Sequence, residues 1–204
     1  MFSLQTNHLL LNEFKDDDLQ NLIAIAKRMQ RSASTIKGYR QFYAFDIDPG
    51  NPPDLIDSKV KEFLDKAKRE RELNPRETYR LAIRFQGKLI GNVTIDMPMT
   101  SKPPELPGDL GVFIDPRYSR AGYAREACSF LIAEYFKRLQ TVDAPTVLKV
   151  TTHPDNQFSR HLIEELGATA GPTKPSHYGH SEPRVIYTLP LKDFKPWTLR
   201  EGQH

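Results

Sequence analysis

A short loop at residues 118–123 carries the residues whose types and spacing best suggest chemistry. Before it, residues 112–114 form an apolar run that predicts a strand, and Asp115-Pro116 stops that strand. After it, apolar residues recur at helical spacing over 124–139. A strand, a tight turn and a helix opening together present free backbone N–H groups at the positive end of a helix dipole. Such a loop is an anion site, best suited to a phosphate or pyrophosphate.

The side chains of this loop support an anion site but leave a second interpretation open. Arg117 and Arg120 place cations beside it. The loop lacks the Gly-x-x-x-x-Gly-Lys-Ser/Thr of a P-loop and the three glycines of a dinucleotide fingerprint. From the residues alone, Gly122 is explained equally well by relief of backbone crowding where a strand turns into a helix.

Two motifs resemble one known family. Ser119-Arg-Ala-Gly-Tyr-Ala124, followed by Arg-Glu-Ala127, resembles the acyl-CoA pyrophosphate loop of the GNAT superfamily of N-acetyltransferases. The usual pattern is Gln/Arg-x-x-Gly-x-Gly/Ala, and this chain keeps Gly122 and Ala124 but has Ser119 at the first position. The block from Asn156 to Ala168 resembles the family's Asn-x-x-Ser/Ala…Leu-Gly-Phe/Ala signature. The Gly-Tyr-Ala-x-Glu-Ala run is most similar to the branch of the ribosomal-protein N-terminal acetyltransferases.

The patterns along the rest of the chain predict the elements that position this loop. We expect strands at 8–14, 78–85, 89–95, 109–115, 146–152, 168–172 and 184–189, and helices at 16–29, 54–71, 124–139 and 156–166. Strands outnumber helices and the early ones are linked as a hairpin, so we expect an α/β (α+β) fold. Its central sheet is mixed, mostly antiparallel, of about seven strands and flanked by helices. The GNAT resemblance agrees, and implies that the strands at 109–115 and 146–152 splay to form an acyl-CoA cleft.

Length and composition limit the classes of protein to consider. The 204 residues are 38% hydrophobic and 27% charged, which indicates a globular protein, and we expect one domain over 1–204 with 191–204 as a loosely packed tail. A formal charge of +3 is too mild for a nucleic-acid binder. No run approaches the roughly 18 apolar residues of a membrane span. The single cysteine, Cys128, fits a reducing, cytoplasmic compartment.

The resemblance implies acetyl-CoA as the cosubstrate and assigns residues to it. Backbone groups of Phe113 and Ile114 would pair with the pantetheine arm and face the thioester. Asn156 would reach the pantetheine from the second motif, although asparagine is also a good helix N-cap, and both roles are compatible. The pyrophosphate would be surrounded, mostly by main-chain N–H groups, at Arg120, Ala121, Gly122, Tyr123 and Ala124.

Ser159 is the candidate proton donor to the departing CoA sulfur. A local hydrogen bond of its hydroxyl to the backbone is an equally good interpretation. Many family members carry a tyrosine four residues later as general acid, but this chain has Ile163 there. Tyr178 and Tyr187 are the alternatives that the sequence offers.

Asp109, at the start of a predicted central strand, is the first candidate for a general base that deprotonates the amine. Glu105, Glu182 and His153 are alternatives, and a carboxylate at a strand end is also common on a plain solvated surface. No metal site is expected, because the remaining candidate ligands lack metal-ligand spacing; these are His161, His177, His180 and Cys128.

The resulting prediction is an N-acetyltransferase that moves the acetyl group of acetyl-CoA directly to a primary amine, either a protein N-terminus or a small molecule. The alternative is a binding module that keeps the acyl-CoA loop but has lost turnover, with a sensing or regulatory role. Ser119 and Ile163, which depart from the family pattern, keep that alternative open. We expect no nucleic-acid or membrane partner and a monomer or homodimer.

Overall fold

Two antiparallel sheets form the framework of the protein. The structure is a computed structural model that describes residues 2–33, 45, 52–74, 76–96, 110–139, 147–175 and 183–198. The first sheet has the order β1-β2-β3-β4-β5, formed by Ser3–Gln5, Leu9–Asn12, Thr78–Phe85, Lys88–Asp96 and Leu110–Ile114. The second has the order β6-β8-β7, formed by Val147–Thr152, Arg184–Pro190 and Thr169–Lys174. Every strand pairing between these described elements is antiparallel.

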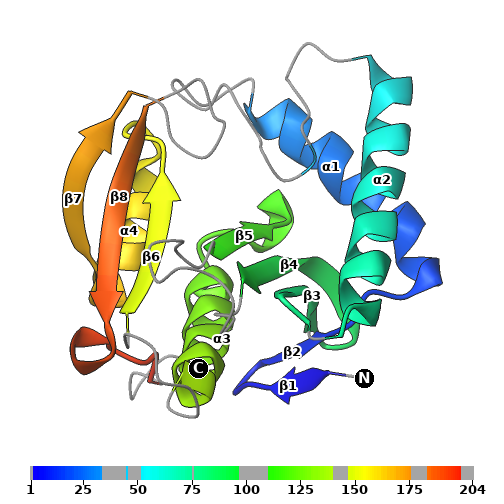
Figure 1. Cartoon of the computed structure of the whole chain (residues 1–204). Helices are drawn as coiled ribbons and strands as arrows, with labels where there is room; N and C mark the ends of the chain where they lie inside the picture. Colours follow the sequence, from blue (N-terminus) through cyan, green and yellow to red (C-terminus); the bar gives the residue numbers. More distant parts are fainter. Residues whose placement is uncertain are drawn as a thin grey trace.

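Four α-helices cover the sheets in the described parts of the chain (Figure 1). They are α1 (Leu19–Ala33), α2 (Pro53–Glu72), α3 (Tyr123–Leu139) and α4 (Gln157–Glu165). Helices α1 and α2 pack on one face of the first sheet, and α3 packs between the other face and the second sheet. Two cores result, which we call the α3 core and the α1–α2 core. Strand β3 contributes to both, with Leu81 in the α3 core and Ala82 in the α1–α2 core, because its side chains alternate.

The predicted fold, a mostly antiparallel sheet flanked by helices, is confirmed. The hairpin expected at 78–85 and 89–95 is present as β3 and β4, which turn at Gln86 and Gly87. Strands β5 and β6 are edge strands of different sheets, and no ladder joins them among the described strands. Side chains of both nevertheless pack in the α3 core. This separation is the arrangement predicted for a splayed strand pair.

The sequence patterns did not predict two features of the sheet. The strand expected at 8–14 is shorter, β2 at Leu9–Asn12, and it pairs with an additional strand, β1. There are therefore eight described strands in two sheets, compared with the expected count of about seven. Strand β1 has only three residues, with an exposed–intermediate–exposed burial pattern, so it carries no run long enough to show strand periodicity.

The first part of the C-terminal segment is not loosely packed, contrary to expectation. After β8 comes a turn of 3-10 helix, η3 (Leu191–Asp193), and the ring of Phe194 lies 5.6 Å from that of Phe136 in α3. The Trp197 backbone N–H donates to the Ser129 hydroxyl at 2.6 Å. The packing of the partly buried Phe194 ring and this hydrogen bond attach the segment to α3. None of the described helices combines the length and apolar character that crossing a membrane requires.

Cys128 makes the stability of the protein sensitive to alkaline pH. Burial raises the pKa of its thiol to about 12, whereas the unfolded thiol titrates near pH 8.5. Between these values only the unfolded chain loses the proton, so the contribution to stability is complete below about pH 8.5 and falls as pH rises. From pH 9 to 10 we expect Cys128 to remove about 1.2 kcal/mol of unfolding free energy. Urea unfolding should show this slope in the parent and not in Cys128→Ala; equal slopes would contradict it.

Candidate cofactor-binding site

The loop between β5 and α3 has the backbone geometry of an anion site. After β5 the chain makes one turn of 3-10 helix, η2 (Pro116–Tyr118), and α3 begins at Tyr123. Arg120 and Gly122 have left-handed φ angles of 65° and 82°, and Ala121 between them does not. Alternation of this kind turns successive N–H groups toward one concave side, which suits an anion.

The first turn of α3 adds further N–H groups to this site. The Glu126 N–H donates to the Gly122 carbonyl at 3.0 Å and makes the first bond of the helix. The N–H groups of Tyr123, Ala124 and Arg125 therefore have no acceptor within the helix. Because α3 is 17 residues long, its dipole is well developed and its N-terminal end favours a negative charge.

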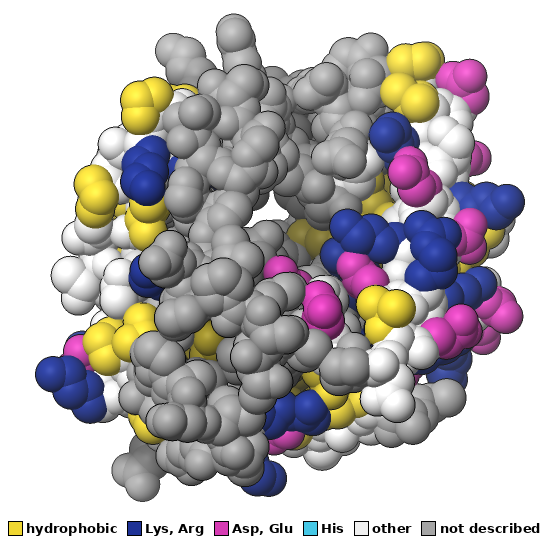
Figure 2. Space-filling view, viewed as in Figure 1, with side chains coloured by type: hydrophobic (Ala, Val, Ile, Leu, Met, Phe, Trp, Pro, Cys, Tyr) yellow, Lys and Arg dark blue, Asp and Glu magenta, His cyan; other side chains and the backbone are white. Residues whose placement is uncertain are grey.

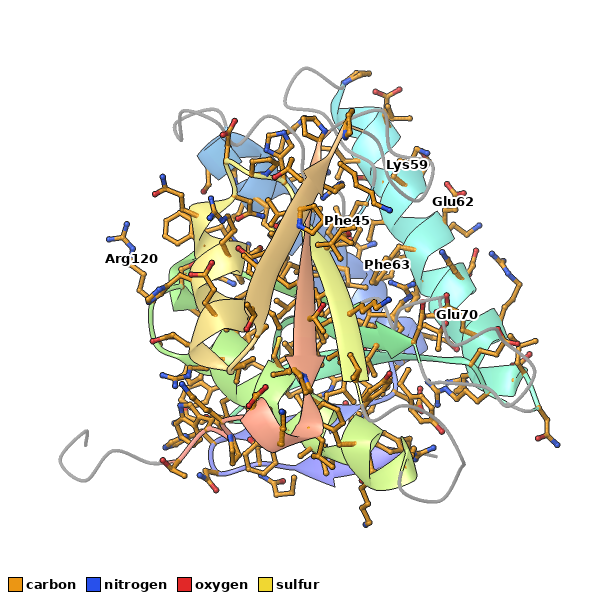
Figure 3. The ribbon with its side chains drawn as sticks, turned by 60° about the vertical axis from the view of Figure 1, so that its left-hand side comes forward. Phe45, Lys59, Glu62, Phe63, Glu70 and Arg120 are labelled. Atoms are coloured by element: carbon orange, nitrogen blue, oxygen red, sulfur yellow. The ribbon has the colours of Figure 1, made fainter. Side chains whose placement is uncertain are left out.

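The loop is open to a ligand. Gly122 is exposed, and a Cβ built on it would meet nothing within 4 Å. Arg120 is also exposed, and Figure 3 shows its side chain projecting outward from the protein. A non-glycine residue with left-handed φ costs about 1 kcal/mol, and such strain is found where function needs the geometry. The outward-facing loop can therefore accept a phosphate group without rearrangement of covering side chains.

Asp115 anchors the start of the loop. Its side chain is fully buried and accepts two hydrogen bonds from the Arg28 guanidinium of α1, at 3.0 and 2.7 Å. It also accepts from the backbone N–H of Arg117 at 3.2 Å and from the Arg117 guanidinium at 2.8 Å. Burial alone would raise the pKa of the Asp115 carboxyl, but the hydrogen bonds from Arg28 and Arg117 outweigh it and hold the pKa below its ordinary value. The anchor is therefore an ionised carboxylate.

Aromatic packing and a second buried carboxylate fix the other side of the loop. The rings of Tyr118 and Tyr123 lie 6.3 and 4.8 Å from that of Phe85, at the end of β3. Glu126, in the first turn of α3, is buried and accepts from the His8 backbone N–H at 2.7 Å and from the Thr6 hydroxyl. The loop is thus held at its start by the Asp115 anchor and on its other side by Phe85 and the turn between β1 and β2.

Asn156 is the N-cap of α4, as the sequence predicted. Its side-chain oxygen accepts from the backbone N–H of Ser159 at 3.1 Å. The Ser159 hydroxyl, in contrast, has no hydrogen-bond partner among the described residues. Among the described residues, the Ser159 hydroxyl therefore does not make the local hydrogen bond to the backbone that was the second interpretation of this residue. The serine side chain is half-buried at the start of α4. Its hydroxyl is not committed to another described group.

Phe113 and Ile114 lie on the last strand of the first sheet. Ile114 pairs with Gly91 of β4 and packs in the α3 core, whereas the Phe113 ring faces the α1–α2 core. There it lies 5.0 Å from the ring of Phe45 and 6.1 Å from that of Phe63. β5 is an edge strand that pairs only with β4 among the described strands, and the resemblance places the pantetheine arm along β5.

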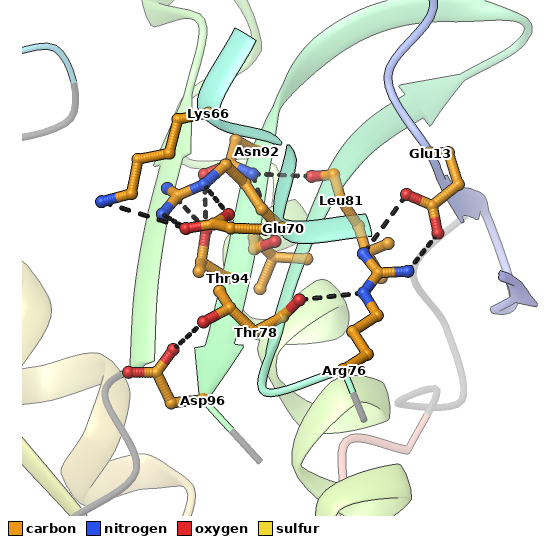
Figure 4. Close-up of polar contacts among 11 residues, drawn as sticks. Glu13, Lys66, Glu70, Arg76, Thr78, Leu81, Asn92, Thr94 and Asp96 are labelled. Carbon is orange, nitrogen blue, oxygen red and sulfur yellow. Dashed lines mark hydrogen bonds and ion pairs between the residues drawn. The ribbon is translucent and has the colours of Figure 1, made fainter. Parts of the chain in front are cut away.

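A polar network beneath α2 was not anticipated from the sequence. Glu70 of α2 accepts from the Arg80 guanidinium at 2.8 and 3.1 Å, and Arg80 also donates to the Thr94 hydroxyl at 3.3 Å (Figure 4). Thr94 in turn donates to the Asn92 side chain at 3.0 Å. The available signal was the alternation of the strands, which puts polar residues at every second position facing α2. The network ties α2 to the sheet.

The outward face of α2 is a solvated, mixed-charge surface, as the sequence indicated. Lys59 and Glu62 form an ion pair at 3.6 Å on this face. Figure 2 shows acidic and basic side chains mixed along this helix. No group of three or more histidine, cysteine or carboxylate side chains in the described parts of the chain could hold a metal ion.

The family is decided by comparison with known sequences. Residues 8–169 match the acetyltransferase (GNAT) domain family. The chain belongs to this family. Among curated proteins, no sequence matches it.

Solved GNAT structures share the fold over nearly the whole chain. A structure described as a ribosomal-protein-serine acetyltransferase from Vibrio cholerae aligns with a TM-score of 0.67 and 21% identity, over 92% of this chain and 97% of that one. Mycobacterium smegmatis RimJ in complex with CoA-disulfide aligns with a TM-score of 0.69 and 14% identity, over 94% of this chain and 87% of that one. The microcin C7 self-immunity acetyltransferase MccE, in complex with acetyl-CoA and AMP, aligns with a TM-score of 0.63 and 15% identity, over 91% of this chain and 93% of that one. At these identities the likeness shows the fold.

Tyr187 and His153, the described alternatives for general acid and base, are both engaged in hydrogen bonds within the fold. Tyr187 is fully buried, and its hydroxyl donates to Glu164 at 2.7 Å while accepting from Arg160 at 3.0 Å. His153 accepts the Asp155 backbone N–H on Nδ1 at 3.1 Å, so this nitrogen is engaged in a local hydrogen bond. Ile163, at the tyrosine position of the family, is buried in the α3 core.

The first candidate base lies outside the described residues, as do several alternatives. These are the base candidates Asp109, Glu105 and Glu182 and the acid candidate Tyr178; His177 and His180, which were considered only as metal ligands, also lie outside the described residues. The structure therefore brings together the loop of residues 119–124 at the start of α3, and places Asn156 and Ser159 together at the start of α4. Asp109 stays a prediction.

Proposed function

We propose that this chain is an N-acetyltransferase that takes acetyl-CoA as cosubstrate and transfers the acetyl group directly to a primary amine. The observation that carries the proposal is the open loop at residues 119–124, with left-handed Arg120 and Gly122 before α3, in a chain of the GNAT family. Successive N–H groups at a helix N-terminus fit the pyrophosphate of CoA in charge and in donor number.

The proposed binding roles follow the elements of the site. Main-chain N–H groups of residues 120–124 hold the pyrophosphate, and the exposed Arg120 side chain adds a cation. Backbone groups of Phe113 and Ile114 on β5 align the pantetheine and polarise the thioester carbonyl, and Asn156 reaches the pantetheine while capping α4. These contacts bring the thioester to the place where an amine can attack it.

The proposed reaction needs one deprotonation and one protonation. An alkyl ammonium titrates near pH 10 and has no lone pair, so the amine must lose a proton before it attacks. Asp109 is proposed to take that proton, directly or through water. The amine nitrogen forms a bond to the acetyl carbon, the carbon–sulfur bond breaks, and the Ser159 hydroxyl is proposed to donate a proton or hydrogen bond to the leaving thiolate.

The acceptor is proposed to be a protein N-terminus or a small-molecule amine. One structure that shares the fold is described as a ribosomal-protein-serine acetyltransferase, and another as a microcin C7 self-immunity acetyltransferase. The segments expected to line the acceptor, 31–53, 97–107 and 173–183, lie largely outside the described residues. We further propose a single domain that works in the reducing cytoplasm, where the buried Cys128 needs no partner.

A panel of amines tests the proposed transfer. The purified protein is incubated with acetyl-CoA and, separately, peptides with free N-termini, polyamines, amino acids and aminoglycosides. Free thiol release that depends on one amine class, with a matching mass increase of one acetyl group on that amine, is the expected result. Binding of acetyl-CoA with no amine-dependent thiol release would favour the alternative, a binding module without turnover. Ile163 at the tyrosine position of the family is the observation that supports that alternative.

Replacing Ser159 with alanine tests the proposed proton donor. The Asn156 cap uses the Ser159 backbone N–H, so the substitution removes only the hydroxyl, and unfolding free energy should change by less than about 0.5 kcal/mol. The kcat for acetyl transfer should fall roughly 10- to 100-fold with little change in KM for acetyl-CoA. Steady-state kinetics with the best amine measures both. A kcat within about twofold of the parent would remove Ser159 from the reaction.

A further inference from the structure

Asp115 stands out among the buried charged residues because it lies directly before the cofactor loop. It has no exposed surface, and its carboxylate contacts only groups from two places, Arg28 of α1 and Arg117 of η2, among the hydrogen bonds of the described residues. Arg28 comes from 87 positions earlier in the chain. No role for this carboxylate is contained in the proposed chemistry.

The geometry around Asp115 joins three rigid parts of the fold. Its backbone N–H donates to the Ile90 carbonyl at 2.7 Å, which extends the contact of β5 with β4 by one residue. Its backbone carbonyl accepts from Tyr118 at 2.8 Å and closes η2. Its side chain caps η2 through the Arg117 N–H and binds Arg28 with both oxygens. The turn that leads into the loop is thus tied to the sheet and to α1 through one residue.

We propose that Asp115 is a positioning residue for acetyl-CoA, which holds η2 so that the N–H groups of residues 120–124 are already turned toward the pyrophosphate. The inference rests on the proposed function, because it concerns the same loop. Preorganised donors bind more tightly than donors that must be ordered when the ligand arrives. Arg28 is the partner on α1 that keeps the carboxylate ionised and in place.

The direction in which acetyl-CoA affinity changes when Asp115 loses its charge distinguishes a positioning role from a purely electrostatic one. Acetyl-CoA is strongly anionic, so removing a negative charge next to its loop should tighten binding if charge alone mattered. A positioning role predicts the opposite, because the neutral side chain keeps the shape but weakens the hold on Arg28 and η2. Asp115→Asn should therefore bind acetyl-CoA more tightly if only charge matters, and more weakly if Asp115 positions the loop.

The test compares Asp115→Asn with Glu13→Gln by titration with acetyl-CoA. Glu13 is also buried, and it forms a two-bond ion pair with Arg76, at 2.5 and 3.3 Å, at the other end of β3. We expect Asp115→Asn to raise the Kd for acetyl-CoA about tenfold, and KM with it, while kcat at saturating acetyl-CoA changes less than about twofold. Glu13→Gln should lose comparable stability and leave the Kd unchanged.

Arg28→Gln is the second variant, in case Asp115→Asn does not fold. It leaves the carboxylate bound to Arg117 and should raise the Kd by a smaller factor, about threefold. An unchanged or lower Kd in the folded Asp115→Asn protein, or in Arg28→Gln where only that variant folds, would overturn the positioning role while leaving the proposed function intact. An equal loss of acetyl-CoA affinity in Asp115→Asn and Glu13→Gln would also overturn the positioning role. A parent protein that does not bind acetyl-CoA would remove both proposals.

Discussion

Replacing Gly122 with glutamate should abolish the stabilisation of this protein by acetyl-CoA. The side chain would enter the open space beside the Gly122 backbone, where no atom lies within 4 Å, and would occupy the proposed pyrophosphate position with a carboxylate. Steric exclusion and charge repulsion act together there. In the parent, acetyl-CoA at about 100 times its Kd should add roughly 2.7 kcal/mol to the unfolding free energy, which a thermal shift detects. In the variant we expect no shift.

Two control variants separate the loss of binding from backbone strain. Gly122→Ala adds the same strain, because φ is +82° in both cases, but adds no charge and little bulk, so it should retain part of the shift. Gly87→Glu places the same residue at a similar φ of +77°, also in open space, but in the β3–β4 turn, and should keep the full shift. A full acetyl-CoA shift in folded Gly122→Glu would show that the cofactor binds elsewhere.

Replacing Gly91 with alanine should cause the largest loss of stability among the substitutions considered. A Cβ on Gly91 would lie 2.2 Å from the Phe113 carbonyl oxygen and 3.1 Å from the Ile114 Cα, both backbone atoms that cannot rotate away. The strands would have to separate where β4 pairs with the end of β5, shortly before the loop at residues 119–124. We expect a loss of about 3 kcal/mol of unfolding free energy, as for severe overpacking.

The matched control for this prediction lies on the facing strand. Gly111 of β5 pairs with Thr94 of β4, and a Cβ there would meet only the Thr94 Cβ, at 4.0 Å. Gly111→Ala should therefore change the unfolding free energy by less than about 1 kcal/mol. Urea unfolding of both variants measures the difference. Equal, small losses would show that β4 and β5 can move apart at low cost, contrary to the close approach seen here.

Local patterns predicted the strand, turn and helix around residues 119–124 because all of these parts are adjacent in sequence. The strand ending at Ile114, the turn with Gly122 and the helix from Tyr123 are set by neighbours within about fifteen residues, so periodicity and turn residues are sufficient. The Asn156 cap was predictable for the same reason. Boundaries of β3 and β8 agreed to within one residue because both begin and end at clear changes of pattern.

Contacts between distant segments could not be predicted in this way. The bond between Arg28 and Asp115 joins residues 87 positions apart, and neither residue carries a local signal of the other. Separation of the strands into two sheets depends on how α3 packs between them, which no single strand records. The contacts of the Phe194 ring and the Trp197 backbone with α3 likewise depend on tertiary structure, so the sequence predicted only a loosely packed tail.

Isothermal titration of the parent protein with acetyl-CoA, followed by CoA, tests the central claim most directly. The loop geometry predicts one site per chain that binds both molecules, since both carry the same pyrophosphate, with a Kd that rises as salt screens the charges. Such a result would place an acyl-CoA site in this chain and direct the amine screen. Absence of binding by a folded parent, at concentrations well above the micromolar range, would contradict the claim that residues 119–124 form a working cofactor loop.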